Sequence, residues 1–255
     1  MTPMLEFDRV TMRYTTQARR QLVALQDCSA IVYRDEFVAI VGPSGCGKST
    51  LLKIASRVLD GTQGEVRFEG QPLKRPTSRI GMVFQQPILL PWRTVLDNVL
   101  FPIDMMGRSL RDSEPVARDL LELVGLAGFE SAMPGELSGG MQQRVAICRA
   151  LVYDPSVLLM DEPFAALDAM TREELGMELL RIWDERRKTV LFVTHSIPEA
   201  ILLADRVFVM TARPGRIAAC IPIDLPRPRD LSMVSTPEYA RYAQEIRNLV
   251  ARRTH

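Results

Sequence analysis

Long hydrophobic runs are missing from this sequence of 255 residues, because charged residues or prolines interrupt every apolar stretch. None of these stretches reaches the roughly 18–20 residues that a helix needs to cross a bilayer. The first ten residues carry Glu6 and Asp8 where a secretory signal would have a basic segment and an apolar run, so we expect no signal peptide. Any role at a membrane would therefore depend on a partner that spans it.

The sequence also has few cysteines and a small net charge. The cysteines show neither CxxC nor metal-like spacing, so we expect reduced, packed thiols in the cytosol. They are Cys28, Cys46, Cys148 and Cys220. A net charge of +1 gives no global electrostatic reason to bind nucleic acid, and we expect no nucleic-acid partner. Hydrophobic residues at 47% and charged residues at 25% are typical of a globular protein and argue against disorder.

Two strand patterns follow one another along the chain. Apolar and polar residues alternate along residues 5–10 and 23–31, which predicts a small antiparallel β-subdomain. Phe37 to Val41 is instead a continuous apolar run, which is typical of a parallel strand buried on both faces. Further strands are predicted at residues 65–68, 80–84, 157–160, 190–194 and 207–210.

Helical patterns alternate with the later strands, which is the βα rhythm of a parallel sheet. Helices are predicted at residues 49–59, 172–187, 198–204 and 237 to about 252. Helical spacing also occupies roughly residues 94–152. The predicted fold class is therefore α/β, with a parallel-sheet core, an antiparallel β-subdomain and a helical insertion. We expect a domain over residues 1–220 that contains the insertion, and a C-terminal extension over residues 221–255 with one helix.

A glycine-rich segment with the spacing G-x-x-x-x-G-K-S lies between the buried strand and the first helix. Its glycines let successive backbone N–H groups face one anion, and the helix N-terminus adds partial positive charge. The predicted phosphate-binding loop consists of Gly42, Pro43, Ser44, Gly45, Cys46, Gly47, Lys48, Ser49 and Thr50. Lys48 would reach the β- and γ-phosphates of a nucleotide, and Ser49 would bind Mg²⁺. Such loops serve GTPases, kinases and helicases alike, so the class of machine stays open at this point.

Two carboxylates, Asp161 and Glu162, follow the apolar residues 157–160 at the end of a predicted strand. In a parallel sheet that end lies beside the phosphate loop, where ligands bind. Asp161 could hold Mg²⁺ and its waters, and Glu162 could act as the general base that polarises the water attacking the γ-phosphate. An isolated acidic pair more often caps a helix or lies in a solvated turn. Its combination with the phosphate loop favours the catalytic interpretation.

The octet Leu137-Ser-Gly-Gly-Met-Gln-Gln-Arg144 lies between the phosphate loop and the acidic pair. It resembles the signature of the ABC ATPases, and it precedes Asp161 by the interval that this family uses. The resemblance covers about residues 5–215 and implies the ABC ATPase fold, ATP and Mg²⁺ as cofactors, and ATP hydrolysis. In this family the signature is a second anion cradle at a helix start. The cradle would consist of Ser138, Gly139 and Gly140.

Three further residues match the family. Tyr14 lies in the early β-region, where the family stacks an aromatic ring on adenine, although a strand tyrosine alone is usually packing. Gln85 ends a predicted strand, where the family's glutamine senses Mg²⁺ and the attacking water; alone, it would be a surface amide. His195 resembles the switch histidine that contacts the γ-phosphate. The resemblance thus implies the catalytic residues Glu162, His195 and Gln85, and the Mg²⁺ ligands Ser49, Gln85 and Asp161, partly through water.

Departures from the family pattern are small. Ala165 stands where the loop that couples paired sites usually begins with serine, which puts one hydroxyl contact across the dimer in doubt.

Within the family, residues 89–95, 213–217 and 225–229 resemble the importers of nitrate, sulfonate and taurine. The alternative is an ABC ATPase that acts on DNA or the ribosome, although this chain has no room for a long coiled coil and carries one cassette.

The resemblance also implies partners. Two copies are expected to meet head to tail, so that each ATP lies between Lys48 of one copy and Ser138 of the other. The chain would lie at the cytoplasmic face of a bacterial inner membrane, beneath separate permease subunits that a solute-binding protein supplies. The apolar residues 88–92, with Trp92, would receive a coupling helix of the permease or would simply pack within the helical insertion. The solute cannot be read from this chain, because the specificity pocket belongs to other chains.

Overall fold

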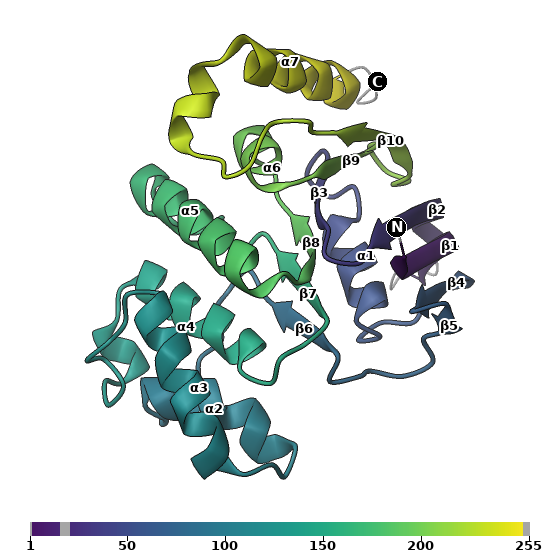
Figure 1. Cartoon of the computed structure of the whole chain (residues 1–255). Helices are drawn as coiled ribbons and strands as arrows, with labels where there is room; N and C mark the ends of the chain where they lie inside the picture. Colours follow the sequence, from purple (N-terminus) through teal and green to yellow (C-terminus); the bar gives the residue numbers. More distant parts are fainter. Residues whose placement is uncertain (1, 16–20, 252–255) are drawn as a thin grey trace. The chain divides into compact units, whose positions relative to one another are not determined.

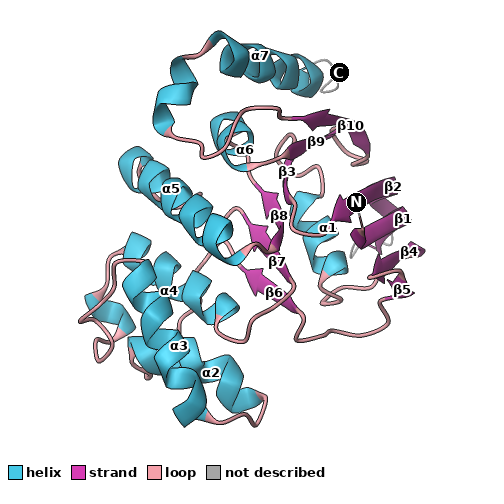
Figure 2. Cartoon of the chain, viewed as in Figure 1, coloured by secondary structure: helices cyan, strands magenta, loops and turns pink. Residues whose placement is uncertain are grey.

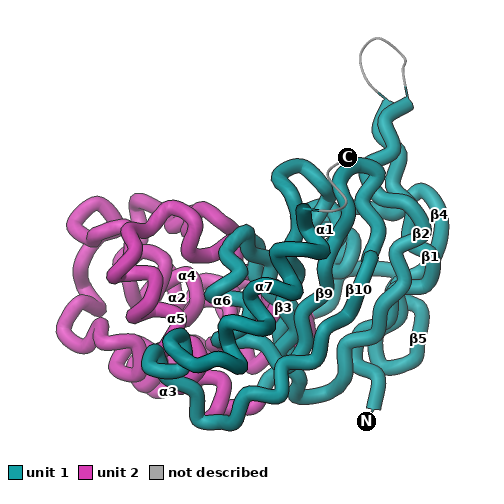
Figure 3. The backbone as a smooth tube through the Cα atoms, turned by 90° about the horizontal axis from the view of Figure 1, so that it is seen from above, with its two compact units in different colours: residues 1–77, 159–161, 188–255 teal, residues 78–158, 162–187 magenta. Residues whose placement is uncertain are grey.

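The computed structural model describes residues 2–15 and 21–251, and Figure 1 follows the chain from purple to yellow. The described chain falls into two compact units, teal and magenta in Figure 3. Unit 1 comprises residues 1–77, 159–161 and 188–255, and unit 2 comprises residues 78–158 and 162–187. Within the described residues, no helix is long and apolar enough to span a membrane.

Unit 1 contains an antiparallel sheet built from β1 (Pro3–Thr15), β2 (Gln21–Tyr33), β4 (Gln63–Phe68) and β5 (Gln71–Pro72). The strand order is β2-β1-β4-β5, shown in magenta in Figure 2. Leu5 lies opposite Phe68 and Phe7 opposite Val66, and all four side chains are buried, whereas Glu6 is half-buried. The predicted antiparallel β-subdomain is therefore present, because side chains two residues apart share one face of a sheet.

The continuous apolar strands form a second sheet. β3 (Phe37–Val41) pairs in parallel with both β8 (Thr189–Val193) and β9 (Arg206–Met210). All residues of β3 and β8 are buried, as expected for parallel strands covered on both faces. The other members are β6 (Ile80–Val83), β7 (Val157–Asp161) and β10 (Ile217–Pro222), and the strand order is β10-β9-β3-β8-β7-β6.

β10 corrects an expectation for the C-terminal region. The sequence predicted that residues 207–210 close the sheet, but β10 adds a strand antiparallel to β9. Cys220 lies opposite Phe208 and Ile221 opposite Val207. The segment Ile-Ala-Ala-Cys-Ile shows little alternation between apolar and polar residues, so its conformation depends on hydrogen bonds to the edge of β9.

The helices of unit 1 are α1 (Lys48–Ala55), α6 (Ile197–Leu203) and α7 (Pro237–Ala251), with a 3₁₀ turn η2 (Leu231–Ser235) before α7. α1 ends before the expected Leu59, because Arg57 adopts a left-handed conformation with a φ of 59°. α7 buries one face and contacts α6 and β9. The last expected residue of this helix, Arg252, lies outside the described residues. The border proposed at residue 220 between a domain and an extension stays a prediction.

Unit 2 contains α2 (Val95–Met105), α3 (Leu110–Leu123), η1 (Pro134–Glu136), α4 (Gly139–Leu151) and α5 (Ala169–Arg186). α2, α3 and α4 pack on one another and account for the helical spacing predicted at residues 94–152 (Figure 1). α5 begins before the expected Arg172, because the Asp168 carboxylate caps it. That carboxylate accepts hydrogen bonds from the N–H of Thr171 at 3.1 Å and from its hydroxyl at 2.7 Å.

Candidate functional site

The glycine-rich segment at residues 42–50 connects β3 to α1. Gly45 and Gly47 have φ values of 72° and 105°, which residues with a Cβ rarely adopt, and so the backbone can curl before the helix begins. Lys48 is 5% exposed, and its Nζ donates to the carbonyls of Gly42 at 3.0 Å and Pro43 at 3.2 Å. Its ammonium group therefore lies against the loop at the N-terminus of α1, where an anion is favoured.

Ser49 and Asp161 are brought together by the fold. The hydroxyl of Ser49, in the first turn of α1, donates to Oδ1 of Asp161 at 2.7 Å. Asp161 ends β7 and is 8% exposed. Hydroxyl, carboxylate and phosphate oxygens are the ligands that Mg²⁺ takes in nucleotide sites. This adjacent pair of oxygen donors therefore fits the magnesium ion that the sequence predicts.

The turn after β9 supports the phosphate loop, and sequence reasoning missed it. Arg213 donates from Nη2 to the carbonyl of Gly45 at 3.0 Å. A Cβ on Gly215 would lie 1.9 Å from the carbonyl oxygen of Cys46, so only glycine fits there. The N–H of Gly215 also donates to the carbonyl of Ala24 in β2 at 2.9 Å. The Pro-Gly pair at 214–215 is a turn signal, but only its contacts show that the turn lies against the loop.

His195 lies exposed between β8 and α6. The residues before and after His195 are hydrogen-bonded to each other: the Thr194 hydroxyl accepts from the N–H of Ser196 at 2.9 Å. The same hydroxyl donates to the carboxylate of Glu199 at 2.5 Å. The N–H of Glu199 donates to the Ser196 hydroxyl at 3.4 Å. The backbone around His195 is therefore held by the first turn of α6, while its ring remains accessible to solvent.

Tyr14 lies near the end of β1, opposite Leu22 of β2. Its side chain is 36% exposed, so it is more accessible than a packing residue would be. An exposed aromatic ring at a strand end can stack on a base, as the sequence predicts.

Glu162 follows β7 in unit 2 and has a φ of 46°, a left-handed conformation that is uncommon for a residue with a Cβ. Such conformations cluster at functional sites, because the surrounding fold must compensate for their strain.

Gln85 is exposed just beyond β6, which ends at Val83, before the expected Phe84. The carbonyl of Phe84 accepts a hydrogen bond from Nε2 of Gln143 at 3.4 Å, which ties this loop to α4.

Ser138 caps α4, and its hydroxyl accepts a hydrogen bond from the N–H of Met141 at 3.3 Å. Ser138 and Gly139 are exposed, whereas a Cβ on the buried Gly140 would lie 2.8 Å from Cγ2 of Thr171 in α5. Unit 2 therefore carries a serine hydroxyl and glycine N–H groups at a helix start, as predicted for the second anion cradle. That the residues of the two units act on one nucleotide stays a prediction.

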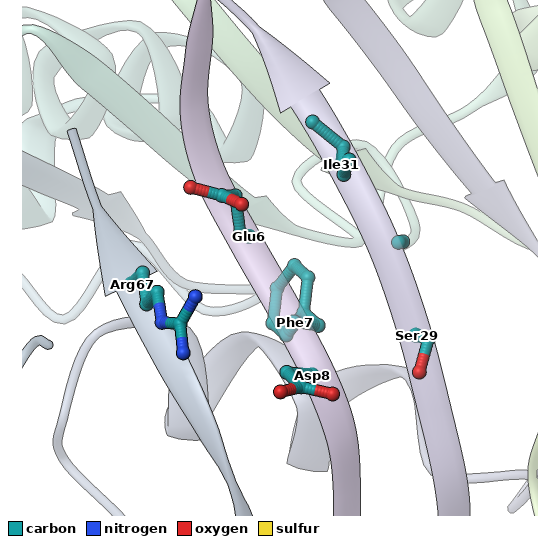
Figure 4. A pocket seen from close by; sticks show the side chains of 7 residues that line it. Glu6, Phe7, Asp8, Ser29, Ile31 and Arg67 are labelled. Carbon is teal, nitrogen blue, oxygen red and sulfur yellow. The ribbon is translucent and has the colours of Figure 1, made fainter. Parts of the chain in front are cut away.

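A cavity of about 440 Å³ lies on the antiparallel sheet of unit 1 (Figure 4). It is lined by Glu6, Phe7, Asp8, Ser29, Ala30, Ile31 and Arg67. The carboxylates of Glu6 and Asp8 would repel phosphate groups, and Arg67 is paired with Glu65 at 2.7 Å. This cavity is therefore a poor nucleotide site.

The cysteines are free thiols. Cys28, Cys46 and Cys148 are buried, as expected, but Cys220 is exposed on β10, so the expectation of packing is wrong for this residue. Burial raises the pKa of Cys28 to about 11 and also raises the pKa of Cys148. Both side chains are therefore neutral at physiological pH and serve packing.

Comparison with known families decides the class of nucleotide machine. Residues 25–165 match the family model described as ABC transporter. The chain belongs to the ABC transporter family. It is therefore an ABC ATPase, and the predicted family and enzymatic activity are confirmed.

Relatives match almost the whole chain. An ABC transporter ATP-binding protein of Methanocaldococcus jannaschii, described as uncharacterized, is 51% identical over 89% of this chain and 84% of its own length. A nitrate import ATP-binding protein of Synechococcus elongatus is 45% identical over 99% of this chain and 93% of its own length. A taurine import ATP-binding protein of Rhizobium johnstonii is 41% identical over 97% and 96% of the two chains.

Solved structures confirm the predicted fold class. A dimeric bacterial ABC transporter cassette superimposes with a TM-score of 0.77 at 33% identity, over 88% of this ABC ATPase and 100% of that chain. A post-hydrolysis state of the same cassette, bound to ADP and phosphate, gives a TM-score of 0.75 at 32% identity over the same shares.

Proposed function

We propose that this ABC ATPase energises the uptake of a small solute of the nitrate, sulfonate or taurine type. It would work as a head-to-tail homodimer on the cytoplasmic face of the membrane, beneath separate permease subunits that a solute-binding protein supplies. The observation that carries the catalytic part is the Ser49–Asp161 pair beside the loop that holds Lys48. Support for uptake comes from relatives named as nitrate and taurine import ATP-binding proteins.

The residues of unit 1 would bind the nucleotide. Tyr14 would stack on adenine, and Lys48 and the N–H groups of the loop would hold the β- and γ-phosphates. Ser49 and Asp161 would hold Mg²⁺, with Gln85 contributing partly through water. The ion supplies positive charge that offsets the charge developing on the phosphate oxygens. His195 would contact the γ-phosphate from the start of α6.

The residues of unit 2 would complete the reaction. Glu162 would orient the attacking water and take up its proton as general base, with Gln85 as a second contact to that water. Ser138, Gly139 and Gly140 would bind the γ-phosphate of the nucleotide held by the partner subunit, since a head-to-tail pair places two shared sites at one interface. The dimeric cassette to which this chain is similar supports a dimer.

The segment at residues 88–92 would receive the coupling helix of the permease. Trp92 is 72% exposed and Ile88 is 61% exposed. Nevertheless, the segment is held firmly: Arg149 donates to the carbonyls of Pro87 at 2.6 Å and Ile88 at 2.9 Å. A pre-organised segment with an exposed aromatic anchor suits a helix-in-groove interface, because little ordering is required when it binds.

The activity is tested by comparing the ATPase rate and ATP affinity of purified variants. Glu162→Gln is expected to bind ATP yet lose about 100-fold or more in turnover, because the general base is lost while the phosphate loop is intact. Lys48→Ala should instead weaken ATP binding by about tenfold or more, because charge-assisted hydrogen bonds are lost. Glu173→Gln, an exposed change in the same unit, is the matched control. Equal turnover in wild type and Glu162→Gln would contradict the assignment.

A further inference from the structure

Arg229 is a buried cation, 4% exposed, whose guanidinium donates hydrogen bonds to five backbone carbonyls. It lies in the proline-rich segment after β10, in the stretch Leu-Pro-Arg-Pro-Arg that ends at this residue. The accepting carbonyls and their distances are Ile201 at 2.9 Å, Leu202 at 3.3 Å, Ala204 at 2.7 Å, Ile223 at 2.9 Å and Leu225 at 3.4 Å. Arg229 therefore joins the C-terminal segment to the end of α6.

The acceptors in α6 are carbonyls that a helix leaves without internal partners at its C-terminus. Arg227 binds the next one, the carbonyl of Leu203, at 2.8 Å. Positive charge at a helix C-terminus also interacts favourably with the helix dipole. Two guanidinium groups from the C-terminal segment thus cap α6, and α7 lies beside the same helix (Figure 1).

Arg227 extends the connection toward the phosphate loop. Its Nη2 lies 2.7 Å from Oδ1 of Asp205. The other carboxylate oxygen of Asp205 accepts the N–H of Phe37 at 2.9 Å, and the N–H of Asp205 donates to the carbonyl of Phe37 at 2.7 Å. Phe37 begins β3, which leads into the loop that holds Lys48. The C-terminal segment, α6 and β3 are therefore linked at one end by hydrogen bonds.

At its other end, α6 begins two residues after His195. Its first turn is fixed by hydrogen bonds among Thr194, Ser196 and Glu199. α6 is only seven residues long, so a displacement of its C-terminal end would also move its N-terminal end, next to His195. We propose that Arg229 and Arg227 are positioning residues, which hold α6 so that His195 stands at the correct place for the γ-phosphate. The catalytic consequence rests on the proposed function of His195.

The test uses Arg229→Lys, with Arg247→Lys on the exposed face of α7 as the matched control. Lysine keeps the charge, but its three donors radiate from one atom and cannot reach the same spread of carbonyls. We expect kcat for ATP hydrolysis to fall by about tenfold while the KM for ATP stays within about twofold, since a small misplacement of a catalytic group lowers the rate without removing the phosphate loop. The control should leave both parameters unchanged.

A double-mutant cycle separates positioning from general destabilisation. In a His195→Ala background, Arg229→Lys should cause no further loss of kcat, because the group that it positions is gone. A loss by the same factor in both backgrounds would show that Arg229 acts by another route and would overturn the proposal.

An NMR measurement tests whether Arg229 and Arg227 position His195, and it does not depend on ATPase activity. The chain has two histidines, so His255→Gln assigns the NMR signals of the His195 ring directly. Arg229→Lys should shift these signals, and so should Arg227→Gln, a second variant that retains hydrogen-bond donors if the first does not fold. Absence of ATPase activity in the wild type would refute the proposed function alone. Unmoved His195 signals with unchanged kcat in a folded variant would refute the positioning role.

Discussion

Gly215 lies so close to the phosphate loop that a side chain at this position would collide with the loop. We expect Gly215→Ala to lower the free energy of unfolding by about 1–3 kcal/mol, because the new Cβ would overlap the Cys46 carbonyl and one backbone segment would have to shift. That shift would also disturb the loop, so ATP affinity should fall. Urea unfolding and nucleotide titration measure the two effects.

Gly61 provides the control in the same unit. A Cβ there would have its nearest neighbour at 3.5 Å, which is ordinary van der Waals contact. Gly61→Ala should therefore leave ATP affinity unchanged and alter stability little. If Gly215→Ala binds ATP as tightly as Gly61→Ala, the supporting role of this turn is wrong.

At the scale of elements, the segment at residues 88–92 is held by hydrogen bonds to side chains of α2 and α4. Asn98 is fully buried in α2, accepts a hydrogen bond from the N–H of Leu90 at 2.8 Å and donates to the carbonyl of Arg93 at 3.0 Å. Since the segment is anchored from within, Trp92→Ala should remove the exposed anchor without unfolding it. We expect permease binding to weaken by about 2 kcal/mol or more and solute uptake to fall, while the isolated chain still binds ATP. Co-purification with the permease and uptake in cells measure these effects.

Val58→Ala is the control for this change, because Val58 is another exposed apolar residue, 64% exposed, and lies in the connection between α1 and β4. It should leave permease binding and uptake as in wild type. Normal assembly and normal uptake with folded Trp92→Ala would discard this segment as the docking surface.

At the scale of the whole molecule, a shared site predicts that damaged chains complement one another. We expect a mixture of Lys48→Ala and Ser138→Arg chains to hydrolyse ATP faster than either variant alone. In the mixed dimer one site carries both lesions, while the other combines an intact Lys48 with an intact Ser138, whereas each homodimer has two damaged sites. The measurement is the ATPase rate of the mixture at constant total protein.

The same mechanism predicts that wild-type activity rises more than linearly with protein concentration while dimers are incompletely formed. This dependence should persist even if one intact site does not suffice for turnover and complementation is absent. Activity strictly proportional to concentration, over a range in which sedimentation detects only monomer, would refute the shared site.

Local patterns in the sequence were enough to predict the family, the fold class and the glycine-rich loop that connects β3 to α1. The loop is readable because its glycines, Lys48 and Ser49 are consecutive, and because a buried strand and a helix flank it in the chain. The strand β3 is readable for a similar reason: burial on both faces demands a continuous apolar run, which is visible in any sequence. The position of Asp161 beside the loop was predicted from the rule that ligands bind at the carboxyl ends of parallel strands, whereas the hydrogen bond between Ser49 and Asp161 was seen only in the structure.

Contacts between distant segments were not readable. β10 carries no strong pattern and pairs because β9 offers a free edge, Gly215 is required because Cys46 lies against it, and Arg229 is buried because α6 ends beside it. In each case the partner is remote in the chain, and one sequence does not contain the distance between them. A local motif records which groups a segment carries, whereas the neighbours that a fold brings to those groups depend on the packing of the whole chain.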